Sequence, residues 1–433
     1  MKDLFATLAD DPAPPLAAGY LDTVLRRGRR SARRRFLGTA AVWVVVVLAV
    51  AGLAVPALPL PERPAAPAAR ASLPERFAGY SVLTGTVGAS PAGRAIALYG
   101  YGNGELFNMF QPVVAGADRN TYRRVDAMED RGRPSALLSP DGTQVLLGDD
   151  NGATRDLVLV DLTTGRRRSV PIGEPVGVRL LAWSPDGRYV AYSAAPIGDN
   201  PDRLGNFVDD EVRRSGELRL LDLSTHQSRA FPEVHPVAQA AFAPDRGRLA
   251  VQVDQQVRLF ELGGRSIGTV EIPAGRELAA GVGWTPDGRF LATVPSGFVL
   301  HATFLWNEGD VTFVAVADGA TPPAPVTGVV QLLGWRSATT LVAATMPMGL
   351  SSIDLTTGAR EQLSLFDTGS TCELGMQTCQ VFDLQLATGL LADVTVRPAS
   401  WPDRGPWPLA LTIPIAVVVL GATYLVWRRL RRR

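Results

Sequence analysis

The segment Trp183–Ala194 reads Trp-Ser-Pro-Asp-Gly-Arg-Tyr-Val-Ala-Tyr-Ser-Ala, and degraded copies of it recur along most of the chain. Proline presets φ in the turn, aspartate bonds its own backbone, and glycine accepts positive φ. Runs rich in β-branched, aromatic and leucine residues flank the turn, as in Val178–Trp183 and Arg188–Ser193, and this pattern predicts a hairpin. The clear copies contain Pro140, Asp141 and Gly142; Pro185, Asp186 and Gly187; Pro244 and Asp245; and Pro286, Asp287 and Gly288, with looser copies at Ser90–Arg94 and Trp335–Ser337.

A third β-rich run and a fourth, more polar run follow each hairpin. Leu157–Leu162 precedes Arg167–Ile172, and Leu350–Leu355 precedes Arg360–Leu365. An Asp-Leu-Thr-Thr-Gly turn separates the two runs in both places. We therefore expect units of four strands, in the order inner, middle, middle, outer.

The spacing of the turn prolines identifies the architecture. Steps of 45, 59 and 42 residues separate positions 140, 185, 244 and 286, and a four-stranded repeat of about 40–45 residues is typical of β-propellers. An ordinary β-sandwich is the alternative, but it has no reason to repeat its turn at a fixed phase. The predicted fold class is all-β, a propeller of six or seven blades. We favour seven, because Val381–Leu386 and Leu390–Val396 supply two further strands that would close the ring with N-terminal strands.

This motif resembles the WD40-like (PD40) repeat of TolB-type β-propellers, over roughly Ser72 to Pro398. The resemblance implies a closed ring of blades around a central channel, used mainly to bind proteins or peptides. The chain departs from secreted TolB in carrying two hydrophobic segments. The recurrent Trp183, Trp284 and Trp335 precede the turn at one phase, so we interpret them as blade-packing residues rather than a sugar platform.

The two apolar segments predict membrane spans. We expect a cytoplasmic Arg-rich tail (1–35), a transmembrane helix (36–58), a Pro/Ala-rich linker (59–73), an extracytoplasmic propeller (74–398), a linker (399–407), a second transmembrane helix (408–427) and a basic cytoplasmic tail (428–433). Arginines outside both spans place both termini in the cytoplasm of a plasma-membrane protein. Alternatively, Arg33–Leu37 fits a twin-arginine export signal, and the first segment would then be processed.

The charge distribution argues against nucleic-acid binding. The net charge of +1 hides eight Lys/Arg within residues 1–35 and five after Trp427, which leaves an acidic middle. Nucleic-acid binding needs a basic stripe. The N-terminal arginines are interpreted as a topology signal that contacts lipid headgroups; the alternative is a docking segment for a cytoplasmic regulator.

The longest step contains an insertion, Ala194–Gly216, which reads as a polar loop. Long loops on rigid scaffolds often carry binding. The candidate binding residues are Asp199, Asn200, Asp202, Arg203, Asp209, Asp210 and Glu211. Its acids lack the alternating spacing of a calcium loop, so we predict no metal ion there and no cofactor elsewhere.

Other sequence signals concern the cysteines and catalysis. Cys372 and Cys379 are the only cysteines, and an exported location favours a disulfide between them. No histidine has zinc-ligand spacing, and there is no Gly-x-Ser-x-Gly elbow, phosphate loop or dinucleotide fingerprint. We predict no catalytic residues and no enzyme activity.

The expected function is a membrane-tethered scaffold or sensor that binds a protein or peptide at the bacterial cell envelope. Two alternatives remain open. One is a transmembrane signalling protein whose N-terminal tail regulates a cytoplasmic factor. The other is an envelope glycan hydrolase or lyase, because carboxylates distant in the sequence can meet in a propeller.

Overall fold

The computed structural model describes residues 70–79, 81, 83–102, 111–129, 135–148, 152–197, 207–296, 308–317, 319–346, 349–366 and 380–407, with single positions between 414 and 428. The chain divides into two compact units, one of Ala65–Pro408 and one of Met1–Pro64 with Leu409–Arg433. The expected span 36–58 lies outside the described residues, as does most of 408–427. Within the described parts, no helix has the length and apolar character needed to cross a bilayer.

The larger unit is built almost wholly from antiparallel strands, which fall into groups of four. In the described residues, the first group is β25 (Gln380–Leu386), β3 (Ala95–Gly102), β4 (Gln111–Gly116) and β5 (Tyr122–Arg124), and the second is β6 (Ala136–Leu138), β7 (Gln144–Leu147), β8 (Thr154–Asp161) and the first half of β9 (Arg167–Trp183). The third group is the second half of β9, β10 (Tyr189–Ala195), β11 (Glu217–Asp222) and β12 (Gln227–Phe231), and the fourth is β13 (Gln239–Phe242), β14 (Arg248–Val253), β15 (Gln256–Glu261) and β16 (Ser266–Glu271). The fifth group is β17 (Arg276–Leu278), β18 (Phe290–Pro295), β19 (Gly309–Ala315) and β20 (Val326–Val329), and the sixth is β21 (Gln331–Trp335), β22 (Thr340–Thr345), β23 (Gly349–Asp354) and β24 (Arg360–Phe366).

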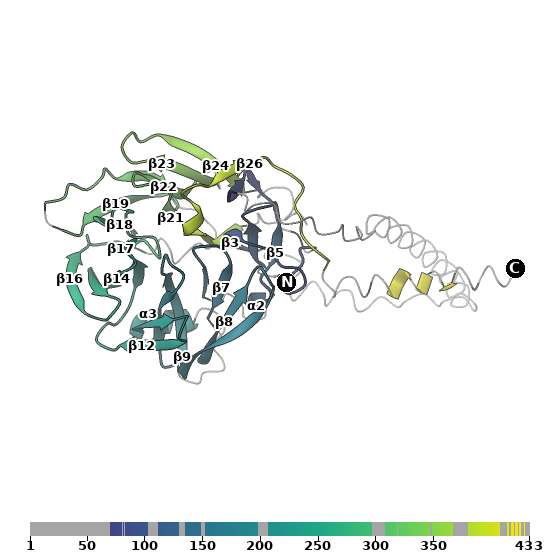
Figure 1. Cartoon of the computed structure of the whole chain (residues 1–433), viewed down its shortest axis with the longest axis horizontal. Helices are drawn as coiled ribbons and strands as arrows, with labels where there is room; N and C mark the ends of the chain where they lie inside the picture. The colour runs from purple at the N-terminus through teal and green to yellow at the C-terminus, as the bar shows by residue number, and fades with distance from the viewer. Residues whose placement is uncertain are drawn as a thin grey trace, which may run out of the picture. The chain divides into compact units, whose positions relative to one another are not determined.

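The groups are arranged as a ring (Figure 1). The first strand of one group contacts the first strand of the next, in the succession β25, β6, β9, β13 and β17, and β21 contacts β25 in turn. These are the inner strands, and the fourth strand of each group is the outermost. An all-β, propeller-like fold is therefore confirmed. The preference for seven blades is not confirmed, because the described strands form six groups of four.

Segments from both ends of the unit close the ring. β25 pairs with β3, as the sequence predicted for Val381–Leu386. The predicted strand Leu390–Val396 is wrong: Thr388–Leu390 is the 3₁₀ helix η2, and strand β26 (Thr395–Arg397) begins only at Thr395. β26 pairs in parallel with β1 (Ser72–Pro74), and β2 (Arg76–Phe77) pairs in parallel with β24.

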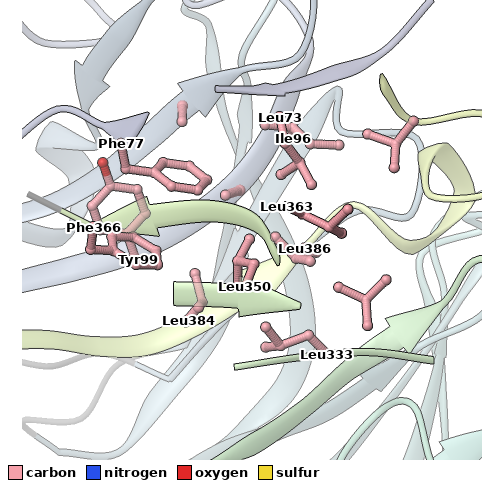
Figure 2. Packing of buried hydrophobic residues seen from close by; sticks show 14 of the residues in the cluster. Leu73, Phe77, Ile96, Tyr99, Leu333, Leu350, Leu363, Phe366, Leu384 and Leu386 are labelled. Atoms are coloured by element: carbon pink, nitrogen blue, oxygen red, sulfur yellow. The ribbon is translucent and has the colours of Figure 1, made fainter. Parts of the chain in front are cut away.

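An aromatic cluster lies at this closure (Figure 2). The rings of Phe77 and Phe366 stack with centroids 4.5 Å apart, and Tyr99 meets both edge-on at 5.7 and 5.4 Å. Such arrangements add to the hydrophobic stabilisation of the buried area. Residues contributed by β2, β3 and β24 thus form one core, so ring closure and core formation are coupled.

Strand direction gives the ring two distinct faces. Since strands alternate in direction, the turns after the first and third strand of every group lie on one face, which we call the turn face. The other connections lie on the opposite face, which we call the helix face because it carries α3 (Phe207–Ser215), between β10 and β11. The short helix α2 (Asp126–Glu129) follows β5, and Asp126 forms an ion pair with Arg167 of β9. On the turn face, the two turns of a group are joined by a repeated backbone hydrogen bond, from Leu162 to Thr143, Leu223 to Arg188, Leu262 to Gly247, Val316 to Arg289 and Leu355 to Thr339.

Candidate functional site

The repeat turns have the geometry that their residues predict. In the second copy, Ser184 Oγ donates to Asp186 Oδ1 at 2.6 Å and the Arg188 amide donates to the same oxygen at 3.1 Å. The Gly187 amide donates to the Ser184 carbonyl, and Gly187 has φ +75°. Asp141 and Asp287 accept equivalent bonds. These carboxylates are used in holding turns.

The turn at Pro244 departs from this pattern. Asp245 accepts from the Gly247 amide at 3.0 Å, but the position with positive φ is occupied by Arg246, at +62°. A non-glycine residue in this region carries a backbone cost. Asp245 also forms an ion pair with Arg248, with 2.6 Å between Oδ2 and Nε.

The recurrent tryptophans pack between blades, as predicted. Trp284 is 3% exposed, and its Nε1 donates to the Ala241 carbonyl of the preceding group at 3.0 Å. Trp335 Nε1 likewise reaches back to Val282 at 3.2 Å. Trp183 bonds within its own turn, to Gly187 at 3.0 Å.

The turn face also contains a shallow depression of about 400 Å³, next to the turn between β23 and β24. Its charged groups already have partners. Arg336 lies 3.5 Å from Glu361, and Asp354 accepts hydrogen bonds from Thr356 and Thr357. This arrangement favours a structural role for the turn face.

The insertion between β10 and β11 is partly helical, which corrects its interpretation as a loop. Asp209, Asp210 and Glu211 lie in the nine-residue helix α3. Acids in its first turn and arginines in its last complement the helix dipole. Its apolar side, Val208 and Val212, packs with Ala195 and Ile197, so α3 is fixed to the ring.

Helix α3 brings Asp209 to a buried arginine of the inner strand β9. The Arg179 side chain is only 7% exposed, and its Nε lies 3.3 Å from Asp209 Oδ1. The other oxygen of Asp209 lies 2.6 Å from Arg213 Nε. Arg179 Nη1 also donates to the Ala238 carbonyl at 2.7 Å, directly before the inner strand β13. One carboxylate therefore bridges two guanidinium groups.

The next two inner strands bring Gln239 and Glu277 to the same end of the ring. Gln239 is 1% exposed, and its Nε2 has no hydrogen-bond partner among the described residues. It pairs with Gln252 in the sheet, and directly opposed residues project from the same side. Since Gln252 Oε1 accepts from the Leu278 amide at 2.7 Å, the Gln239 side chain lies on the side of its sheet that faces β17. Glu277 of β17 is 7% exposed.

We call Arg179, Asp209, Arg213, Gln239 and Glu277 the Arg179 cluster. Burial, together with the nearby positive charge of Arg213, lowers the pKa of Arg179 to about 10, although the negative charges of Asp209 and Glu277 oppose this shift. The guanidinium still carries its charge at neutral pH. A buried cation needs anionic partners, and the cluster holds both signs of charge beside an amide with unused donors. It is suited to binding a polar ligand.

Sequence reasoning found Asp209 of this cluster but missed the rest. Arg179 lies inside the predicted strand Val178–Trp183, and a lone arginine in an apolar run is a signal that could have been followed. Asp199, Asn200, Asp202 and Arg203 lie outside the described residues, as do Cys372 and Cys379. Among the residues that the structure describes, no group of three or more His, Cys, Asp or Glu is placed to hold a metal ion.

No protein-family model matches the chain, and no curated protein matches it. Solved structures similar to it include TolB from Acinetobacter baumannii, with 18% identity and a TM-score of 0.43 over 68% of this chain and 67% of that one. An oligogalacturonate lyase in complex with manganese has 16% identity and a TM-score of 0.41, over 70% of this chain and 87% of that one. The oligogalacturonate lyase from Vibrio parahaemolyticus has 12% identity and a TM-score of 0.40, over 64% and 80%. The propeller fold itself is established by the sheet arrangement of this chain, and TolB is among the structures that it resembles.

Proposed function

We propose that this protein is a binding propeller that holds a protein or peptide on its helix face, at the Arg179 cluster. The observation that supports this most is the position of Asp209 of α3, which bridges the buried Arg179 of β9 and the half-buried Arg213 at one end of the inner strands. The accessible members of the cluster are Asp209 and Arg213, whose side chains are 35% and 21% exposed, so a ligand that pairs with them lies over the buried Arg179.

The cluster suits a peptide better than an apolar ligand. A peptide offers backbone carbonyls to Arg213, and its amides or basic groups can approach Asp209. Arginine is enriched at the centres of protein interfaces. Charged groups arranged with both signs favour one register of the bound chain over others.

The proposed ring has six blades, in accordance with the six groups of strands. We further propose that the apolar segments 36–58 and 408–427 anchor the chain in the plasma membrane, with the propeller extracytoplasmic and both termini cytoplasmic. The support for this is the apolar, charge-free sequence of each segment and the arginines outside both. Alkaline phosphatase fused after Arg433 should be inactive and fluorescent protein fused there should fluoresce; the reverse would refute a cytoplasmic C-terminus.

The binding proposal is tested by site-specific photocross-linking of the full chain in cells. A photoreactive residue replaces Asp210, which is exposed on α3, and a matched variant carries it at Thr164, exposed in a turn on the opposite face. We expect cross-linked partners from position 210 and few from position 164. Equal yields at both positions, or partners only at 164, would place binding elsewhere.

The identity of the captured partner separates the alternative functions. Envelope proteins support the scaffold or sensor. A cytoplasmic regulator captured by the same method from residues 1–35 would support the signalling function. Enzyme activity is tested by incubating the purified full chain with oligogalacturonate and other envelope glycans, and turnover would refute a purely binding role.

A further inference from the structure

Trp401 is 96% exposed, more than any other large hydrophobic side chain in the described residues. It lies in the segment that follows β26 and leaves the propeller. Tryptophan has a large apolar surface that is unfavourable in water, and a single N–H that needs a polar partner. An exposed tryptophan of this kind is a candidate contact residue.

The backbone on both sides of Trp401 is fixed. Asn120 Nδ2 donates to the Ser400 carbonyl at 2.6 Å, and the Asp403 amide donates to the Asn120 carbonyl at 2.8 Å. The Tyr122 amide donates to the Asp403 carbonyl at 2.8 Å. Trp401 therefore projects from a chain held against the turn between β4 and β5, and its position costs little further entropy on binding.

The segment that carries Trp401 precedes the second apolar segment in the sequence, and it contacts a turn that also binds the beginning of the propeller unit. The charge-free run begins at Leu409, eight residues after Trp401. Eight residues of fully extended chain span at most roughly 28 Å. At the other end of the propeller unit, the Ser72 amide donates to the Ala117 carbonyl of the same β4–β5 turn at 2.9 Å. Arg119, in that turn, is exposed.

We propose that Trp401, together with Arg119 of the β4–β5 turn, docks on the phospholipid bilayer, with the indole ring at the level of the headgroups. This inference rests on the membrane anchorage proposed above. The interface between hydrocarbon and water accommodates both the apolar ring and the indole N–H, and the Arg119 guanidinium pairs with lipid phosphate. The contact holds the helix face, with the Arg179 cluster, in one orientation to the membrane.

The test uses the full chain in vesicles of phosphatidylcholine and phosphatidylglycerol. A nitroxide label is attached at Trp401→Cys, in a chain that also carries Cys372→Ser and Cys379→Ser. The matched control carries the label at Met346→Cys, which is 47% exposed and lies on the helix face after β22. We expect the ratio of oxygen to water-soluble nickel collisions to be several-fold higher at 401 than at 346. Equal ratios would overturn the proposal.

A second measurement covers the case in which removing the cysteines impairs folding. Quenching of tryptophan fluorescence by brominated lipids is compared between the natural chain and Trp401→Phe, and a smaller quenched fraction in the variant is expected. An unchanged fraction would overturn the proposal. Spin–spin broadening at 401 that persists when the protein is diluted in lipid would also overturn it, in favour of a second copy of the chain.

Flotation of the same vesicles distinguishes this inference from the anchorage on which it rests. If the protein does not float with the vesicles, the proposed anchorage fails. If it floats while the label at 401 stays accessible to water, the anchorage stands and only the Trp401 contact is refuted.

Discussion

Arg123 of β5 and Asp403 of the C-terminal segment, 280 residues apart in the sequence, form an ion pair with 3.1 Å between Nη2 and Oδ2. The Arg123 side chain is 5% exposed, whereas that of Asp403 is 61% exposed. Arg123 also donates to the carbonyls of Ser90, Tyr122 and Asp403. This single guanidinium joins three segments of the chain at the closure of the ring.

The first prediction follows from that asymmetry. Arg123→Met should lower the free energy of unfolding by about 2–4 kcal/mol, because it leaves one buried and two partly buried carbonyls without this donor. Asp403→Asn should cost less than about 1 kcal/mol, because the carboxylate is solvated and the pair is screened. Chemical denaturation of both variants measures the difference. An equal loss in the two variants would show that the ion pair, not the carbonyl bonds, holds the segment.

The second prediction concerns positive φ in the repeat turns. Gly187→Ala should destabilise the protein by about 1 kcal/mol, because alanine is strained at φ +75°. No atom lies within 4 Å of the added Cβ, so the effect is one of backbone alone. Arg246→Gly is the matched variant, and it should be neutral or stabilising because the strain at +62° is relieved. The reverse order of thermal midpoints would contradict this account.

The third prediction concerns the dependence of the free energy of unfolding on pH. Burial raises the pKa of Asp186, but hydrogen bonds from Ser184 and the Arg188 amide outweigh it and hold the pKa below its usual range. Hydrogen bonds from Thr356 and Thr357 lower the pKa of Asp354 to about 2. A carboxyl group whose pKa is lower in the folded chain than in the unfolded chain stabilises the fold at pH values above its unfolded pKa. This stability is lost as the pH falls through the folded pKa. We expect stability to decline from about pH 5 to about pH 2.

Asp186→Asn and Asp354→Asn together provide the control. Urea denaturation at several pH values should give a flatter profile in the double variant than in the natural chain. Identical slopes would mean that other carboxyl groups dominate the response to acid.

The fourth prediction tests the Arg179 cluster. Arg179→Met should reduce cross-linking from position 210 by more than about tenfold, because truncation of a buried arginine hot spot typically costs 2 kcal/mol or more. Arg214→Ala on the same helix is the control, since the Arg214 side chain is 66% exposed, and it should leave the yield unchanged. Circular dichroism shows whether Arg179→Met still folds. A folded variant with full cross-linking would remove the cluster from the binding site.

The strands and turns within each repeat could be predicted from the sequence alone. The predicted run Leu157–Leu162 corresponds to β8, and Leu350–Leu355 corresponds to β23, each within a few residues. The Pro-Asp-Gly turns were predictable because their hydrogen bonds connect residues two to five positions apart. The packing of Trp284 was predictable because a repeat places every copy in the same environment.

Interactions between distant segments required the tertiary structure. α3 was interpreted as a loop because its composition is polar, and only packing of Val208 and Val212 on the ring makes those residues helical. Arg179, Gln239 and Glu277 lie at one end of the ring because successive inner strands begin at one level, which depends on the register of neighbouring blades. The sequence determined the repeating unit through bonds within it, whereas closure of the ring decided which side chains of different units converge, because those contacts form only between segments far apart in the chain.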